Sequence, residues 1–160
     1  MITAATHKET MNTPSTPHVS NPLASLKINH TAIRVPDFDT AVAWYAEKLD
    51  FRLKQSVSVA GLSFGFLYPA GDESFHFELM AGPGAATRPA YANLHDSYNM
   101  SGWHHPGFSV DSVDAVINEL KRRDVTIASE PHDVHAMGLR VAFFADPWGN
   151  LFEVIQSITQ

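Results

Sequence analysis

The sequence predicts an α+β fold of two tandem β-α-β-β-β modules, which form a cupped eight-stranded mixed sheet with the helices outside. Two observations lead to this prediction. The same succession of strand and helix patterns occurs twice in the 160 residues. A shift of 75 residues also places His30 on His105 and Glu78 on Glu153 without a gap. An internal repeat of this kind indicates a duplicated structural unit.

The first module is expected over residues 26–80. It begins with a segment rich in strand formers and continues with apolar residues at helical spacing, where Asp37 or Asp39 can supply the N-cap. Three short segments of strand-forming residues follow, and turn residues separate them. The expected elements are a strand at 26–35, a helix at 37–50, and strands at 51–59, 62–69 and 74–80.

The second module is expected over residues 103–157 and repeats this order. Its elements are a strand at 103–110, a helix at 111–124, and strands at 125–129, 138–146 and 151–157. The two modules form one domain, 25–160, and residues 81–102 link them. A loop of this length is usually functional. Its possible substrate contacts are Arg88, Tyr91, His95 and Tyr98, although no spacing supports any of them.

The composition narrows the functional classes. A net charge of -6 with eleven Lys and Arg residues leaves no basic stripe, so nucleic acid and anionic membranes are poor partner hypotheses. The absence of Cys excludes disulfides, thiolate catalysis and Cys-based metal sites, and it is typical of a cytoplasmic protein. Residues 1–24 are polar, without the apolar block of a signal peptide, and are expected to be a flexible tail.

Strand parity predicts a metal site. His30 and Arg34 alternate with the apolar residues that a helix would cover, and His105 shares its side with Trp103. Glu78 and Glu153 likewise point away from the apolar positions of their strands. All these side chains are expected on the concave, helix-free faces, around a shared cavity.

A divalent metal would remove the cost of placing two carboxylates in such a cavity. Two imidazoles and two carboxylates suit one Zn, Ni or Co ion per site, with Fe or Mn as further possibilities. A single His or Glu on a strand is more often structural. Finding the pair twice in the same register favours metal binding by His30, Glu78, His105 and Glu153.

Several other residues receive an expectation. His76 shares a face with Glu78 and is expected to donate a hydrogen bond to a metal-binding residue, although it could instead replace Glu78 as a ligand or bind the substrate. Trp103 is a candidate substrate contact. His104 is expected on the face opposite His105, in a structural or exposed position. Surface roles are expected for His132 and His135, which could instead reach over the cavity, and a packing or turn role for Trp148.

Four stretches carry a family resemblance: HTAIRVPDFDTAVAWYAEKLDF, FHFELM, HPGFSVDSVDAV and DPWGNLFEV. Over residues 26–157 the chain resembles the vicinal oxygen chelate superfamily, which includes glyoxalase I, bleomycin-resistance proteins, extradiol dioxygenases and methylmalonyl-CoA epimerase. The resemblance implies paired modules, commonly a homodimer, and a metal chelated by vicinal oxygens of a small-molecule substrate. Whether the site lies within one chain or across a dimer is left open.

The ligand order most resembles that of glyoxalase I. By this resemblance Arg34 matches an arginine that contacts the glutathione carboxylate, although it could equally pair with another anion or a neighbouring acid. One difference weakens glutathione as the substrate. Glyoxalase I has an asparagine shortly after its first ligand glutamate, whereas Met80, Ala81 and Gly82 follow Glu78 here.

The first functional hypothesis is a metal-dependent lyase or isomerase of the glyoxalase type, in which Glu153 or Glu78 moves a proton between neighbouring carbons. The second is an Fe(II)-dependent extradiol dioxygenase, with His30, His105 and Glu153 as the facial triad. The third is a metal-free drug-binding resistance protein. The presence of all four candidate ligands favours the first hypothesis.

Overall fold

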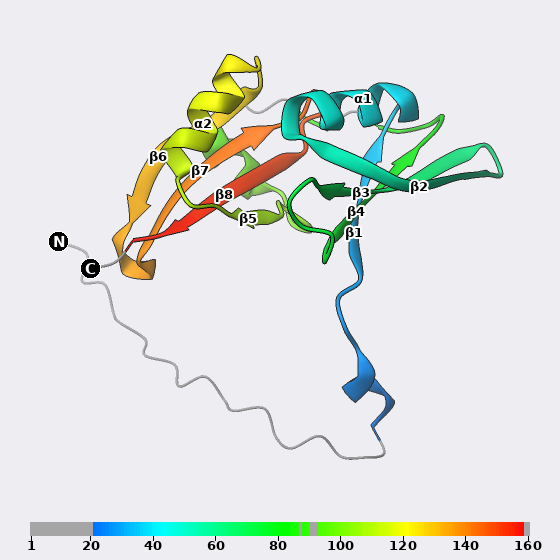
Figure 1. Cartoon of the computed structure of the whole chain (residues 1–160), viewed down its shortest axis with the longest axis horizontal. Helices are drawn as coiled ribbons and strands as arrows, with labels where there is room; N and C mark the ends of the chain where they lie inside the picture. Colours follow the sequence, from blue (N-terminus) through cyan, green and yellow to red (C-terminus); the bar gives the residue numbers. More distant parts are fainter. Residues whose placement is uncertain (1–20, 87, 90–92, 159–160) are drawn as a thin grey trace.

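The computed structural model describes residues 21–86, 88–89 and 93–158. They form two β-α-β-β-β modules, which confirms the α+β prediction (Figure 1). Module one contains β1 His30–Val35, α1 Phe38–Leu49, β2 Phe51–Val59, β3 Leu62–Pro69 and β4 His76–Ala81. Module two contains β5 Gly107–Ser109, α2 Val113–Arg122, β6 Thr126–Val134, β7 Leu139–Ala145 and β8 Leu151–Ser157. Three 3₁₀ helices complete the chain: η1 Pro22–Ser25, η2 Leu94–Asn99 and η3 His135–Met137.

The eight strands make two four-stranded sheets, ordered β1-β4-β3-β2 and β5-β8-β7-β6. In each sheet the first strand runs parallel to the last strand of its module. Ala32 pairs with Glu78 in the first sheet, and Gly107 pairs with Glu153 in the second. The two pairs are 75 residues apart at both positions, so the structure reproduces the register of the sequence repeat.

Local chemistry explains how each helix begins. The Asp37 side chain accepts a hydrogen bond from Thr40 N at the start of α1. The Ser112 hydroxyl accepts one from Ala115 N at the start of α2. Each cap satisfies a backbone N–H that has no partner within its helix.

One hydrophobic core joins the two modules. It contains residues that face the helices in both sheets, among them Phe77 of module one and Phe152 of module two. The rings of these two residues lie 6.0 Å apart, and those of Phe51 and Phe108 lie 6.1 Å apart. Both helices lie along the same side of the sheets (Figure 1). The helix-free faces therefore turn away from the shared core.

The two helix-free faces differ in how they are covered. In module two, η2 covers the sheet, because buried Leu94 packs with Val141 and Phe143. In module one the corresponding sheet face is open, and Val57 and Val59 are 60% and 57% exposed. Exposed apolar residues on a sheet are typical of a surface that another element or chain covers.

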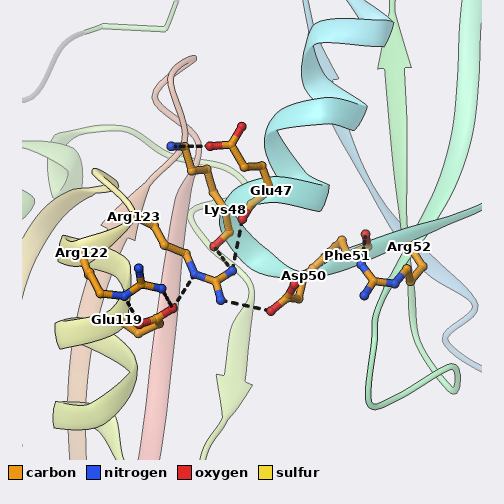
Figure 2. Close-up of polar contacts among 8 residues, drawn as sticks. All are labelled: Glu47, Lys48, Asp50, Phe51, Arg52, Glu119, Arg122 and Arg123. Carbon is orange, nitrogen blue, oxygen red and sulfur yellow. Dashed lines mark hydrogen bonds and ion pairs between the residues drawn. The ribbon is translucent and has the colours of Figure 1, made fainter.

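A polar cluster forms a second link between the modules (Figure 2). Arg123 follows α2 and donates hydrogen bonds to the carbonyl oxygens of Glu47 and Lys48, at 3.1 and 3.3 Å, near the end of α1. The same guanidinium lies 3.2 Å from Asp50 Oδ2 and 2.7 Å from Glu119 Oε1. It therefore satisfies carbonyl groups that α1 leaves without a helical partner.

Asp146 organises the turn between β7 and β8 and connects it to α1. Its carboxylate accepts hydrogen bonds from Trp148 N, Asn150 N and Asn150 Nδ2, and from the buried Tyr45 hydroxyl at 2.8 Å. Burial raises the pKa of Asp146, although these donors act in the opposite direction. Burial and the neighbouring Asp146 raise the pKa of Tyr45, which keeps the phenol protonated as a donor.

We expect Tyr45→Phe to lower the free energy of unfolding by about 1–2 kcal/mol, because Asp146 then loses one donor inside the core. The variant should also be more sensitive to pH. A carboxyl group whose pKa is higher in the folded state than in the unfolded state loses its stabilising contribution as pH rises from the unfolded value. Without the Tyr45 donor the pKa of Asp146 rises further. Urea denaturation at a series of pH values above 4 should therefore show a steeper loss of stability in Tyr45→Phe than in the unaltered protein. Equal slopes would contradict this coupling.

Three strands, β1, β5 and β6, differ most from their predicted boundaries. β1 begins at His30 rather than at residue 26, and β5 covers only 107–109 of the predicted 103–110. Pro106 explains the second difference, because proline has no N–H for the ladder and restricts the residue before it. β6 extends beyond residue 129 to Val134 through irregular pairing with β7. Of the predicted tail, residues 1–20 lie outside the described residues. No helix in the described ranges is long and apolar enough to cross a membrane.

Candidate metal site

Module one brings His30 and Glu78 together. His30 is the first residue of β1, Glu78 lies in the neighbouring β4, and His30 Nε2 is 3.5 Å from Glu78 Oε2. The His30 ring packs edge-on against Phe66, with ring centres 5.3 Å apart. The side chains of His30 and Glu78 are 35% and 17% exposed, so the pair is accessible but partly shielded from water.

Module two repeats this arrangement. His105 Nε2 lies 3.2 Å from Glu153 Oε2, and these side chains are 27% and 17% exposed. The His105 ring packs edge-on against Phe143 at 4.9 Å. Gly107 pairs with Glu153 in the sheet, and a Cβ atom at this position would lie 2.8 Å from Ile155 Cδ1 and 3.4 Å from Glu153 Oε2. The glycine therefore leaves room chiefly for the Ile155 side chain, next to the carboxylate.

The geometry of both pairs fits coordination of a common cation. Two donor atoms bound to one metal at about 2.1 Å lie about 3.0 Å apart at a right angle and about 3.4 Å apart at the tetrahedral angle. The Nε2–Oε2 distances of 3.5 and 3.2 Å are close to these values. Imidazole nitrogen and carboxylate oxygen are also suitable donors for Zn, Ni, Co, Mn or Fe.

One chain does not bring the four predicted ligands into a single cluster. Among the described residues, no three His, Cys, Asp or Glu side chains lie close enough together to hold one metal ion. The structure instead contains two half-sites of one His and one Glu each. The shared core explains this separation. It joins the helix-facing sides of the two sheets, so the helix-free faces that carry the two pairs do not face each other within one chain.

Strand alternation predicted His104 on the face opposite His105, and this prediction is wrong because the two rings are in contact. Because β5 begins only after Pro106, residues 103–106 do not alternate as a strand does. His104 Nδ1 lies 2.6 Å from His105 Nδ1, and His104 Nε2 lies 2.7 Å from the hydroxyl of buried Ser97. No pattern in the sequence marks Ser97, because its contact with His104, seven residues later, depends on how η2 folds back.

Arg34 is held by backbone carbonyl groups. Nη1 donates to the carbonyl oxygens of Val35 and Met80, at 2.8 and 3.0 Å. Nη2 donates to those of Gly82 and Pro83, at 2.8 and 3.0 Å. The guanidinium therefore ties the end of β4 and the following turn to β1. Its predicted contact with a substrate carboxylate stays a prediction, and these four bonds compete with it.

We expect Arg34→Met to lower the free energy of unfolding by about 1–3 kcal/mol, because four carbonyl groups lose a charged donor. Metal affinity should change little, since Arg34 makes no contact with either His–Glu pair in the bonds above. Chemical denaturation together with zinc titration tests both points. A raised KM for a carboxylate-bearing substrate, without loss of stability, would instead support the substrate contact.

The other predicted contacts occupy different surroundings. His76 pairs with His30 across β1 and β4, and its Nε2 accepts from Lys54 Nζ at 3.2 Å. Trp103 lies outside β5 and is 93% exposed. It lines a groove of about 1200 Å³ between the modules, as does His30. His76 thus lies beside the first half-site, while the substrate role of Trp103 stays a prediction.

The remaining candidates are spread over the linker and module two. Arg88 donates to Asn150 Oδ1 at 3.4 Å, and Tyr98 packs against His95 and His104. Tyr91 lies outside the described residues. His132 is within β6 and His135 is in η3, and both are exposed. Trp148 packs against Tyr45 and Trp44, in keeping with its predicted packing role.

The chain is similar to proteins of several organisms over most of its length. An uncharacterized protein, YurT of Bacillus subtilis, is 30% identical over 82% of this chain and 99% of its own length. Human mitochondrial methylmalonyl-CoA epimerase is 28% identical over 82% of this chain and 74% of its own. A probable lactoylglutathione lyase of Vibrio cholerae is 24% identical, over 84% and 94%.

A solved structure shares the fold at lower identity. The glyoxalase family protein from Enterococcus faecalis superimposes with a TM-score of 0.67 and 22% identity, over 82% of this chain and 98% of that protein. The family model for the Glyoxalase/Bleomycin resistance protein/Dioxygenase superfamily matches residues 27–154, which include both His–Glu pairs. The chain belongs to the Glyoxalase/Bleomycin resistance protein/Dioxygenase superfamily.

Proposed function

We propose that the protein is a metal-dependent lyase or isomerase that moves a proton beside a carbonyl group of a small substrate with two adjacent oxygens. The main support is the pair of half-sites, His30 with Glu78 and His105 with Glu153, which occur at the same register of two modules. Relatives named as a lactoylglutathione lyase and a methylmalonyl-CoA epimerase agree with this reaction class.

We further propose that two copies of the chain assemble each complete site, with module one of one copy facing module two of the other. Each half-site supplies two donors, whereas zinc takes four ligands. The open sheet face of module one, with Val57 and Val59 exposed, is a surface that a second copy could cover. A twofold homodimer of this kind would contain two identical four-ligand sites.

When bound, a divalent metal supplies Lewis acidity that polarises the substrate carbonyl and acidifies the neighbouring C–H. His30 and His105 would hold the metal through Nε2, and their edge-on packing against Phe66 and Phe143 holds the rings in place. Glu78 or Glu153 takes the proton from one carbon through its carboxylate oxygen and returns it to the neighbouring carbon or the opposite face.

We expect the substrate to be recognised through its two chelating oxygens rather than through a glutathione group. Four donors of Arg34 already bind carbonyl groups, and Met80, Ala81 and Gly82 follow Glu78 without an amide side chain. A small 2-oxo aldehyde adduct would provide oxygens on adjacent carbons. A 2-substituted malonyl thioester would provide two carbonyl oxygens on the carbons that flank C2, which can also chelate one ion. Either substrate also carries an acidic C–H for the glutamate.

Metal content and turnover together test this function. Protein purified without added metal should contain close to one divalent ion per chain by elemental analysis. Nickel, cobalt and zinc forms should then be tested with the hemithioacetal of methylglyoxal and glutathione and with a 2-substituted malonyl thioester in deuterated water. Turnover or deuterium uptake supports the proposal. Oxygen uptake with catechols and Fe(II) would favour the dioxygenase instead, and a metal content near zero would favour a metal-free binding protein.

A further inference from the structure

We propose that the residue immediately before each candidate metal-binding histidine, Asn29 in module one and His104 in module two, is a positioning residue. It holds a proton on Nδ1 of the following histidine, so that Nε2 presents a lone pair to the metal. This inference rests on the proposed metal site and adds residues to it. No zinc-binding role follows for Asn29 or His104 themselves.

In module two the proton positions follow from a chain of four groups. The Ser97 hydroxyl must donate to the carbonyl oxygen of Leu94, because a carbonyl can only accept. The same Ser97 oxygen lies 2.7 Å from His104 Nε2, so it accepts from that nitrogen. His104 therefore carries a proton on Nε2.

A neutral imidazole has one donor nitrogen and one acceptor nitrogen. With its proton on Nε2, His104 is an acceptor at Nδ1, which lies 2.6 Å from His105 Nδ1. His105 must then donate from Nδ1. Its Nε2 then carries a lone pair and faces Glu153 Oε2 at 3.2 Å, where a metal ion could bind both atoms.

The first group of this chain of bonds lies in the buried part of the linker. Ser97 is only 1% exposed and lies in η2, which packs on the second sheet through Leu94. The chain of bonds thus connects the linker to the metal ligand.

Module one reaches the same result with a different side chain. Asn29 Oδ1 lies 2.8 Å from His30 Nδ1, and an amide oxygen only accepts, so His30 donates from Nδ1. His30 Nε2 then faces Glu78 Oε2. Asn29 and His104 are 75 residues apart, which makes them the same position of the repeat. Two unrelated acceptors at one repeat position support a common task, as acceptors often fix the tautomer of metal-bound histidines.

The asymmetry between modules predicts unequal effects. Asn29 and His30 are exposed, so water can replace the Asn29 acceptor at little cost. The contact of His104 with His105 is partly buried and is supported by Ser97. Loss of the acceptor in module two should therefore weaken the site more than loss of the acceptor in module one.

The test compares His104→Leu with His104→Asn in the full-length protein. Leucine removes the acceptor, whereas asparagine restores the acceptor found in module one. We expect His104→Leu to weaken zinc binding about 10- to 100-fold by calorimetric titration. His104→Asn should recover most of the affinity, and Asn29→Ala should cost only a few-fold. His135→Leu, which alters an exposed histidine in η3, is the matched control and should bind like the unaltered protein.

Nitrogen-15 NMR of the histidine rings in the metal-free protein supplies a readout that does not depend on the metal. With neutral rings, His105 and His30 should both carry the proton on Nδ1, and His104→Leu should allow His105 to populate the other tautomer. A proton on Nε2 of His105 in the unaltered protein, or equal zinc affinities for His104→Leu and His104→Asn, overturns the inference. If the unaltered protein binds no zinc, the proposed function fails, and the NMR result alone still decides which tautomer these neighbours select.

Discussion

A mixture of His30→Ala chains and His105→Ala chains is expected to regain metal binding and activity that neither variant has alone. Each variant by itself lacks one imidazole in every site, so both should be inactive. After joint unfolding and refolding, a mixed dimer can combine the intact module one of the His105→Ala chain with the intact module two of the His30→Ala chain. That site contains all four ligands.

The amount of recovery is set by the assembly. Equal amounts of the two chains give mixed dimers in about half of the molecules, and one of two sites in each mixed dimer is complete. About a quarter of all sites should therefore bind zinc and turn over substrate. Zinc titration and steady-state rates on the refolded mixture measure this fraction directly.

A matched control uses two variants of the same module. His30→Ala mixed with Glu78→Ala leaves every site with a damaged module one, so no recovery is expected. Recovery in this control would contradict the proposed sites, because each of them lacks one ligand from module one. No recovery in the first mixture, despite mixed dimers in native mass spectrometry, would contradict a site shared between two copies of the chain.

The sequence repeat was sufficient to predict the module order and the two His–Glu pairs. A period-two pattern and a gapless shift place Glu78 and Glu153 at equivalent positions, and hydrogen bonding between neighbouring strands brings each close to its histidine. These are contacts within one module, which local patterns encode. The separation of the two pairs depends on how the modules pack against each other. The same apolar residues on the helix-facing sides would be expected whether the site lies within one chain or between two copies, so the sequence does not distinguish the two arrangements.

His104 shows where strand alternation stops being informative. The rule that neighbours point to opposite faces holds only in a strand, and Pro106 delays β5 until Gly107. His104 and His105 are therefore free to meet through Nδ1. Pro106 can be read from the sequence, and it restricts the expected alternation of side chains to the residues that follow it. The contact with Ser97 could not have been predicted, because it depends on where the linker packs.

The second large effect concerns the core that joins the modules. Phe152 is fully buried, and its ring stacks on Phe144 at 5.1 Å and on Phe108 at 6.2 Å. It also meets Tyr45 and Phe77 of module one, at 6.1 and 6.0 Å. A cavity at this position would remove contacts from both modules at once.

Phe152→Ala is therefore expected to lower the free energy of unfolding by about 3–5 kcal/mol. Met137→Ala, at a side chain that is 69% exposed, should change it by less than about 0.5 kcal/mol. Urea denaturation followed by both fluorescence and circular dichroism provides the measurement. Because one core serves both modules, the two signals should move together in a single transition. A variant in which one module unfolds while the other keeps its original midpoint would show that Phe77 and Tyr45 do not depend on Phe152, and that the modules are stable independently.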